Sequence, residues 1–139
     1  MPQPLWSDPF LLSRATTLQT LLNAGKTLRL FANSFLPTPD TLLAAFQECS
    51  FPGYAAISLD GLITGPTALV PGMFQLDSGV LVFQSTGGPS QTIYGWYIDD
   101  GTHMLSCQLL DVAVTICAGG AYAVQLRPLE ISQSVLVQP

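Results

Sequence analysis

The chain has 139 residues, of which 48% are hydrophobic and only 9% are charged, and its formal net charge is −5. The length suits one domain with a sizeable core, and the hydrophobicity excludes a disordered acidic chain. Four Lys and Arg residues cannot build a surface that binds phosphates, so we expect no nucleic-acid partner. Globular domains carry about 25% charged residues. We therefore expect other subunits to cover much of this surface, the alternative being a small domain with a neutral surface.

Neither a secretory signal nor a membrane-spanning segment is predicted. The first basic residue, Arg14, follows the first apolar stretch, whereas a signal peptide begins with its basic residues. The uncharged stretch at residues 78–98 is long enough to span a bilayer, but Gly87, Gly88 and Pro89 interrupt it. We expect a protein that is made in a cytoplasm and has no membrane partner.

An amphipathic helix is predicted over residues 8–24. Ser7 suits its N-cap, Pro9 its first turn and Gly25 its end. One apolar stripe has the helical spacing of four, three and four residues, and it consists of Leu11, Ala15, Leu18 and Leu22.

From residue 26 onward the pattern is that of β-strands. A short helix is predicted at residues 39–47, capped by Thr38, with Leu42, Leu43 and Phe46 facing inward. Alternation and Gly-rich turns predict strands at residues 27–32, 55–59, 67–70, 80–86, 91–98, 104–110, 112–117, 121–127 and 129–137. This pattern is typical of a mainly β protein, an antiparallel β-sandwich or jelly-roll-like domain with an N-terminal helix and one short helix. We assign residues 1–25 to an N-terminal arm and helix, and residues 26–139 to the β-sandwich with a C-terminal extended tail.

Several of these strands are apolar on both faces. Leu81 and Phe83 alternate with Val80 and Val82. An antiparallel sheet in a small domain normally shows one face to water. We expect the second face to be covered either by helices and loops of this chain or by another subunit.

No group of residues predicts a reaction, so we expect no enzyme, no cofactor and no metal. His103, Cys107 and Asp111 are four residues apart, which places neighbouring members about 13 Å apart on a strand. That distance prevents a catalytic triad within the strand. A small hydrolase that uses His103 and Cys107 remains a formal alternative. Asp99 and Asp100 suit a turn rather than an acid–base pair or a calcium site.

The three cysteines, Cys49, Cys107 and Cys117, are odd in number and show no C-x-x-C spacing. We expect buried thiols rather than disulfides or metal ligands. The aromatic residues Tyr94, Trp96, Tyr97 and Tyr122 suit two interpretations, a platform that binds a sugar or packing inside the protein.

The order of several motifs resembles that of small virion proteins of tailed bacteriophages. These motifs are LRLFAN at residues 28–33, PTPDT at residues 37–41, GYA at residues 53–55 and TIYGWYI at residues 92–98. The resemblance covers residues 28–110. It implies a non-enzymatic structural protein of the virion, namely a capsid decoration (cement) protein that bridges and stabilises major capsid subunits. The alternative is a tail, baseplate or fibre component with a glycan- or surface-binding β-sandwich.

The resemblance also implies the partners and the location. The expected partners are the major capsid protein and further copies of this chain, with a homotrimer favoured. The protein would reside in the virion, after assembly in the host cytoplasm. We expect contacts from Trp6 and Phe10 in the N-terminal arm and from Val135, Leu136 and Val137 in the tail, which could add a strand to a neighbouring sheet.

Overall fold

The computed structural model describes residues 5–131 and is mainly β, with antiparallel sheets and an N-terminal helix, which confirms the predicted fold class. The described chain divides into two compact units. Unit 1 contains residues 5–24, 60–80 and 125–131, and unit 2 contains residues 25–59 and 81–124. The two units alternate along the chain, whereas the sequence suggested a single boundary after residue 25.

Unit 1 begins with helix α1, Asp8–Leu22, as predicted. The hydroxyl of Ser7 accepts a hydrogen bond from the Phe10 N–H, and Gly25 follows the helix with a φ of 70°. That left-handed conformation suits glycine, because glycine has no Cβ. Leu11 and Ala15 on the predicted apolar stripe are buried against Phe74.

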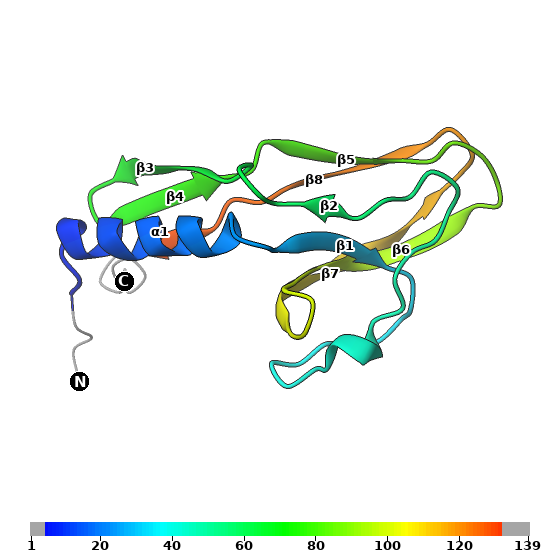
Figure 1. Cartoon of the computed structure of the whole chain (residues 1–139), viewed down its shortest axis with the longest axis horizontal. Helices are drawn as coiled ribbons and strands as arrows, with labels where there is room; N and C mark the ends of the chain where they lie inside the picture. Colours follow the sequence, from blue (N-terminus) through cyan, green and yellow to red (C-terminus); the bar gives the residue numbers. More distant parts are fainter. Residues whose placement is uncertain (1–4, 132–139) are drawn as a thin grey trace. The chain divides into compact units, whose positions relative to one another are not determined.

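A three-stranded antiparallel sheet completes unit 1, and α1 lies along it (Figure 1). Its order is β3 (Thr64–Val70), β4 (Met73–Asp77) and β9 (Leu129–Ile131). The side-chain amide of Asn23 joins the helix end to the sheet, since it both accepts a hydrogen bond from the Ile63 N–H and donates one to the Ile63 carbonyl. Strand β4 was not predicted, although Phe74 and Leu76 alternate with more exposed neighbours.

Unit 2 contains two sheets. The larger has the order β2 (Ile57–Ser58), β1 (Thr27–Phe31), β6 (Gln91–Asp99) and β7 (Met104–Ile116), all antiparallel. The smaller pairs β5 (Val80–Gln84) with β8 (Ala121–Gln125). Strand β7 combines the two strands expected at residues 104–110 and 112–117. The pairing with β6 is nevertheless shifted between Leu109 and Val114, where several β7 residues lie opposite Tyr94.

The second face of β1 and β6 is covered by a loop of the same chain, residues 33–47, which lies beside the larger sheet (Figure 1). Phe46 and Phe35 from this loop pack edge-on against Phe31 of β1, and Phe46 stacks on Tyr97 of β6 at a centroid distance of 4.2 Å. Unit 2 therefore buries this face without a second subunit.

The short helix expected at residues 39–47 is only a 3-10 turn, η1, at Leu43–Ala45. Thr38 does not cap it, because Thr38 and Thr41 hydrogen-bond each other and close a separate turn. Leu42, expected to face inward, is exposed, whereas Phe46 is buried as predicted. In the described part of the chain, no helix is long and apolar enough to cross a membrane.

Candidate functional site

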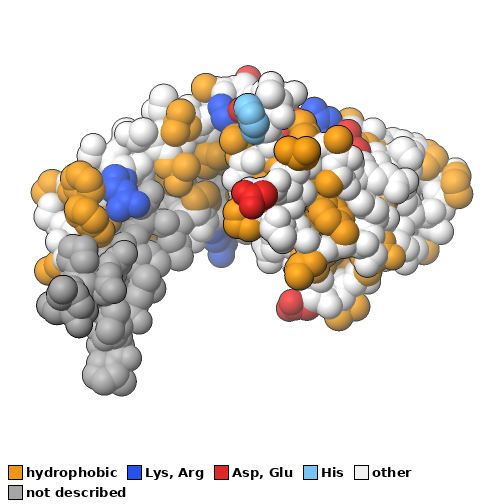
Figure 2. Space-filling view, turned by 90° about the horizontal axis from the view of Figure 1, so that it is seen from below, with side chains coloured by type: hydrophobic (Ala, Val, Ile, Leu, Met, Phe, Trp, Pro, Cys, Tyr) orange, Lys and Arg blue, Asp and Glu red, His pale blue; other side chains and the backbone are white. Residues whose placement is uncertain are grey.

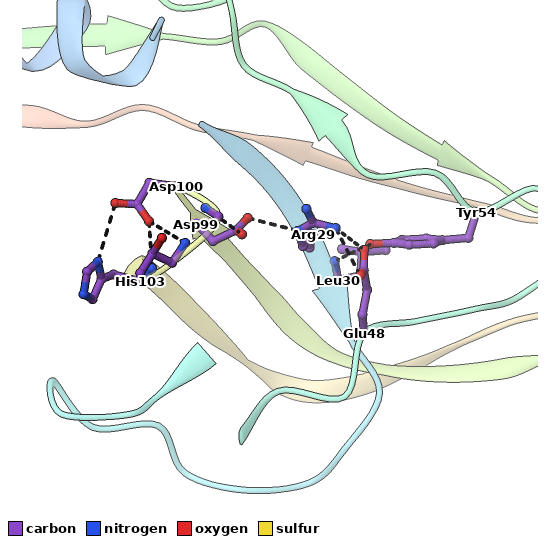
Figure 3. A network of polar contacts seen from close by, with 9 residues as sticks. Arg29, Leu30, Glu48, Tyr54, Asp99, Asp100 and His103 are labelled. Atoms are coloured by element: carbon purple, nitrogen blue, oxygen red, sulfur yellow. Dashed lines mark hydrogen bonds and ion pairs between the residues drawn. The ribbon is translucent and has the colours of Figure 1, made fainter. Parts of the chain in front are cut away.

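A network of charged side chains lies on β1 of unit 2 and contains one of the few cations of the chain (Figure 3). Arg29 donates from Nε to Asp99 Oδ1 at 3.0 Å and from Nη1 to both carboxylate oxygens of Glu48, at 3.0 and 3.1 Å. The Asp99 side chain is only 3% exposed. A buried carboxylate is stable only when it is paired, so Arg29 neutralises Asp99 and connects β1, β6 and the segment that follows the loop.

Tyr54 completes this network. Its hydroxyl donates to Glu48 Oε2 at 2.7 Å and accepts a hydrogen bond from the Leu30 N–H at 3.2 Å. Burial, followed by the hydrogen bond to Glu48, raises the pKa of Tyr54 far above its usual value. Burial lowers the pKa of Arg29, but the hydrogen bonds to Asp99 and Glu48 outweigh that effect and leave the pKa raised. Both groups therefore keep their protons. The network has a structural role, and we call it the clasp because it joins β1, β6 and the segment that follows the loop.

Asn33 holds the two ends of the loop together. Its side-chain oxygen accepts from the Gln47 N–H, and its side-chain nitrogen donates to the Ala45 carbonyl, both at 2.9 Å. The loop thus has a fixed base at Asn33 and a charged clasp just beyond its far end. This arrangement holds the tip of the loop in position next to β7.

A groove of about 380 Å³ lies between the loop and β7, lined by residues 37–39 and 104–107. A smaller hollow of about 180 Å³ adjoins it and shares Pro39 and Met104. The lining of the larger groove contains no charged residue, and it contains Leu105, which is 45% exposed. An uncharged groove beside an outer strand is suited to binding an extended polypeptide.

Large hydrophobic side chains are also exposed elsewhere in unit 2. Leu36 and Leu42 on the loop are 78% and 75% exposed, and Val112 at the shifted part of β7 is 78% exposed. Figure 2 shows hydrophobic side chains at many points of one face, with few charged ones between them. With 9% charged residues in the chain, this surface carries fewer charges than is typical of an isolated domain.

The structure does not assemble His103, Cys107 and Asp111 into a site. His103 is exposed and faces Asp100, with 3.8 Å between Nδ1 and Oδ2. Backbone hydrogen bonds from His103 and Thr102 lower the pKa of Asp100, as expected for an acid in a turn. In residues 5–131 there is no group of three His, Cys, Asp or Glu side chains that could hold a metal ion.

Of the four aromatic residues considered as a sugar platform, Tyr94, Trp96 and Tyr97 lie on β6, and the latter two alternate in direction along the strand. Tyr97 is buried in the aromatic cluster with Phe31 and Phe46, and Tyr94 packs against that cluster. Tyr122 belongs to β8, in the other sheet. The arrangement supports the interpretation of these residues as packing.

The expected contact residues of the N-terminal arm lie in unit 1. Trp6 is half-buried, packs against the cluster of Leu11, Ala15 and Phe74, and stacks on Phe10 at 5.0 Å. Phe10 remains exposed. Trp6 thus fixes the start of α1. Val135, Leu136 and Val137 lie outside the described residues.

Glu48 and the role of Arg29 were not predicted from the sequence. The available signal was the rarity of cations: an arginine at a half-buried position of an apolar strand requires an acidic partner. The acid could not be chosen from the sequence, because Glu48 and Asp99 are 19 and 70 residues away from Arg29.

Alkaline pH is expected to destabilise unit 2. Burial, together with the charge of Glu48, raises the pKa of Cys49 to about 12, and burial raises that of Tyr97 to about 12. The unfolded chain loses these protons first, near pH 9 for the thiol and pH 10 for the phenol. The free energy of unfolding therefore falls from about pH 9 to pH 12, by about 1.4 kcal/mol per pH unit for each such proton.

Urea unfolding at pH values from 7 to 10.5 measures this slope. Between pH 9 and 10, the free energy of unfolding should fall less steeply with pH in Cys49→Ala than in the wild type. Below pH 8, this decrease should be absent from both proteins. Equal slopes would contradict the assignment to Cys49.

Comparisons with models of protein families, with curated proteins and with solved structures find no match to this chain.

Proposed function

We propose that the chain is a non-enzymatic structural protein of a phage particle, a capsid decoration protein that binds major capsid subunits and further copies of itself. The observation that carries the proposal is the combination of a surface with few charges and exposed large hydrophobic residues on unit 2. Interfaces of stable assemblies are depleted of charge and bury such residues. We take the particle to be a phage virion because the motifs at residues 28–98 resemble those of small phage virion proteins.

The clasped loop supports the same proposal. Leu36 and Leu42 protrude from a loop whose base is fixed by Asn33 and whose far side is tied to the sheet through Glu48. A loop that is already ordered loses little conformational entropy when it binds. Its exposed leucines are therefore suited to binding a partner rather than to filling a core.

Co-sedimentation tests the proposal. The full chain is co-expressed with the major capsid protein encoded in the same genome, and assembled shells are pelleted through sucrose. We expect the chain in the pellet at a fixed ratio to the shell subunit, and at least a tenfold weaker association for Leu36→Lys/Leu42→Lys. Ser34→Lys, also on an exposed loop position, is the control for added charge and should bind as the wild type does. A monomeric chain that stays in the supernatant would refute the proposal.

A further inference from the structure

The register of β9 reaches the end of its neighbour β4. Leu129, Glu130 and Ile131 pair with Gln75, Phe74 and Met73 of β4, in that order. Met73 is the first residue of β4 and follows the turn at Pro71 and Gly72. Within the described residues, the pairing of β9 with β4 therefore extends to the first residue of β4.

The sequence after β9 predicts a further extended segment. Residues 132–139 read SQSVLVQP, with no charge and no glycine. Its centre, Val135-Leu136-Val137, has high β-propensity, and Val135 and Val137 would share one side of a strand. A segment with this composition can pair its backbone groups by adding as a strand to a sheet edge.

Strand β7 offers such an edge. It is the outermost strand of its sheet, and in the described part of the chain no strand pairs with its outer side. Residues 106–109 pair regularly with β6, and the shift that follows ends this regular stretch. Residues 104–109 carry no charged side chain. An unpaired edge of this kind accepts an added strand through main-chain hydrogen bonds.

The groove beside this edge supplies space for side chains. It is lined by residues 104–107 of the same stretch and by the loop residues 37–39. Because Pro37 and Pro39 lack N–H groups, the wall opposite β7 offers apolar surface with few backbone donors. Two valines on one side of an added strand fit such a lining.

We propose that residues 132–138 of one copy add as a strand to the outer edge of β7 in a second copy, with Val135 and Val137 in the groove. This inference rests on the proposed function, because it assigns the contact between copies. A net charge of −5 opposes self-association in general, and this contact joins two uncharged segments. Since each copy both donates and accepts a strand, the contact can close into a symmetric ring or pair.

Disulfide cross-linking of the full-length chain tests this contact. Cys107 lies in the groove lining, and Cys117 is removed by Cys117→Ser so that the exposed thiol does not react. Val135→Cys or Val137→Cys is added, and equal amounts of ¹⁴N- and ¹⁵N-labelled protein are mixed and oxidised at pH 9. The alkaline pH is chosen because burial raises the pKa of Cys107.

We expect covalent dimers and larger species joined through Cys107, with mixed isotope labels in the linked peptides. Ser134→Cys, on the opposite side of the added strand, is the matched control and should link at least fivefold less. Cys107→Ser should abolish the product. Linkage within single chains only would overturn the assignment to a second copy, and absent linkage, or equal linkage from residues 134 and 135, would overturn docking at β7.

This experiment needs no capsid. Cross-linking without binding to shells would therefore refute the role in the capsid and leave the contact intact. Binding to shells without cross-linking would refute the contact between copies and leave the role in the capsid intact.

Discussion

Replacing Arg29 with methionine is expected to lower the free energy of unfolding by about 3 kcal/mol. The substitution leaves the Asp99 carboxylate buried without its cation and also releases Glu48. The cost of an unpaired buried charge is much larger than the value of an exposed ion pair. Urea unfolding, followed by circular dichroism at pH 7, measures the loss.

The matched control is Arg127→Met. Arg127 faces Asp77 at 3.7 Å, and the two side chains are 56% and 44% exposed, so the loss should stay below about 0.5 kcal/mol. Adding Asp99→Asn to Arg29→Met removes the buried charge and should restore part of the stability. Equal losses for Arg29→Met and Arg127→Met would show that the network is not a clasp.

Gly95→Ala is expected to cost about 3 kcal/mol as well. A Cβ atom at Gly95 would collide with the Gln108 carbonyl of β7 and would lie 2.7 Å from the ring of Phe31. Both neighbours are held, Gln108 by the sheet and Phe31 by the aromatic cluster, so neither can move away at low cost. In a Trp6→Phe background the fluorescence of Trp96, the next residue along β6, reports the unfolding of unit 2.

Gly87→Ala serves as the control for the loss of a glycine. The nearest atom to its added Cβ is 4.0 Å away, and its φ is not in the left-handed range. We expect a change within about 0.5 kcal/mol. If Gly95→Ala were equally mild, Phe31 would not be packed against the strand as described.

Local sequence signals predicted the elements that depend on neighbouring residues. Ser7, Pro9 and Gly25 marked both ends of α1, and alternation marked β1 and β6 within one residue of their bounds. The helix expected at residues 39–47 was wrong, because a threonine hydroxyl can close a turn as readily as cap a helix, and here the Thr41 hydroxyl accepts from the Thr38 N–H. The packing of Phe46 on Phe31 joins residues that are distant in the sequence, and no local pattern predicts it.

The candidate site was harder to predict for the same reason. Leu42 was expected to face inward but is exposed, and the clasp joins residues 29, 48 and 99. No local sequence pattern predicts a contact among three residues that lie so far apart in the chain. The low charge content indicated that some surface would be apolar, but it could not indicate that this surface would be the loop and the edge of β7.

The alternation of the two units along the chain affects the order in which they can form during synthesis. Helix α1 leaves the ribosome first, but Phe74, against which it packs, follows about 60 residues later, and β9 follows later still. Unit 1 therefore cannot close until nearly all of residues 5–131 have been translated, whereas every segment of unit 2 is available by residue 124. A nascent chain paused before β9 would present the sheet of unit 1 without one of its three strands, and chaperones that bind incomplete sheets would meet the protein at that stage.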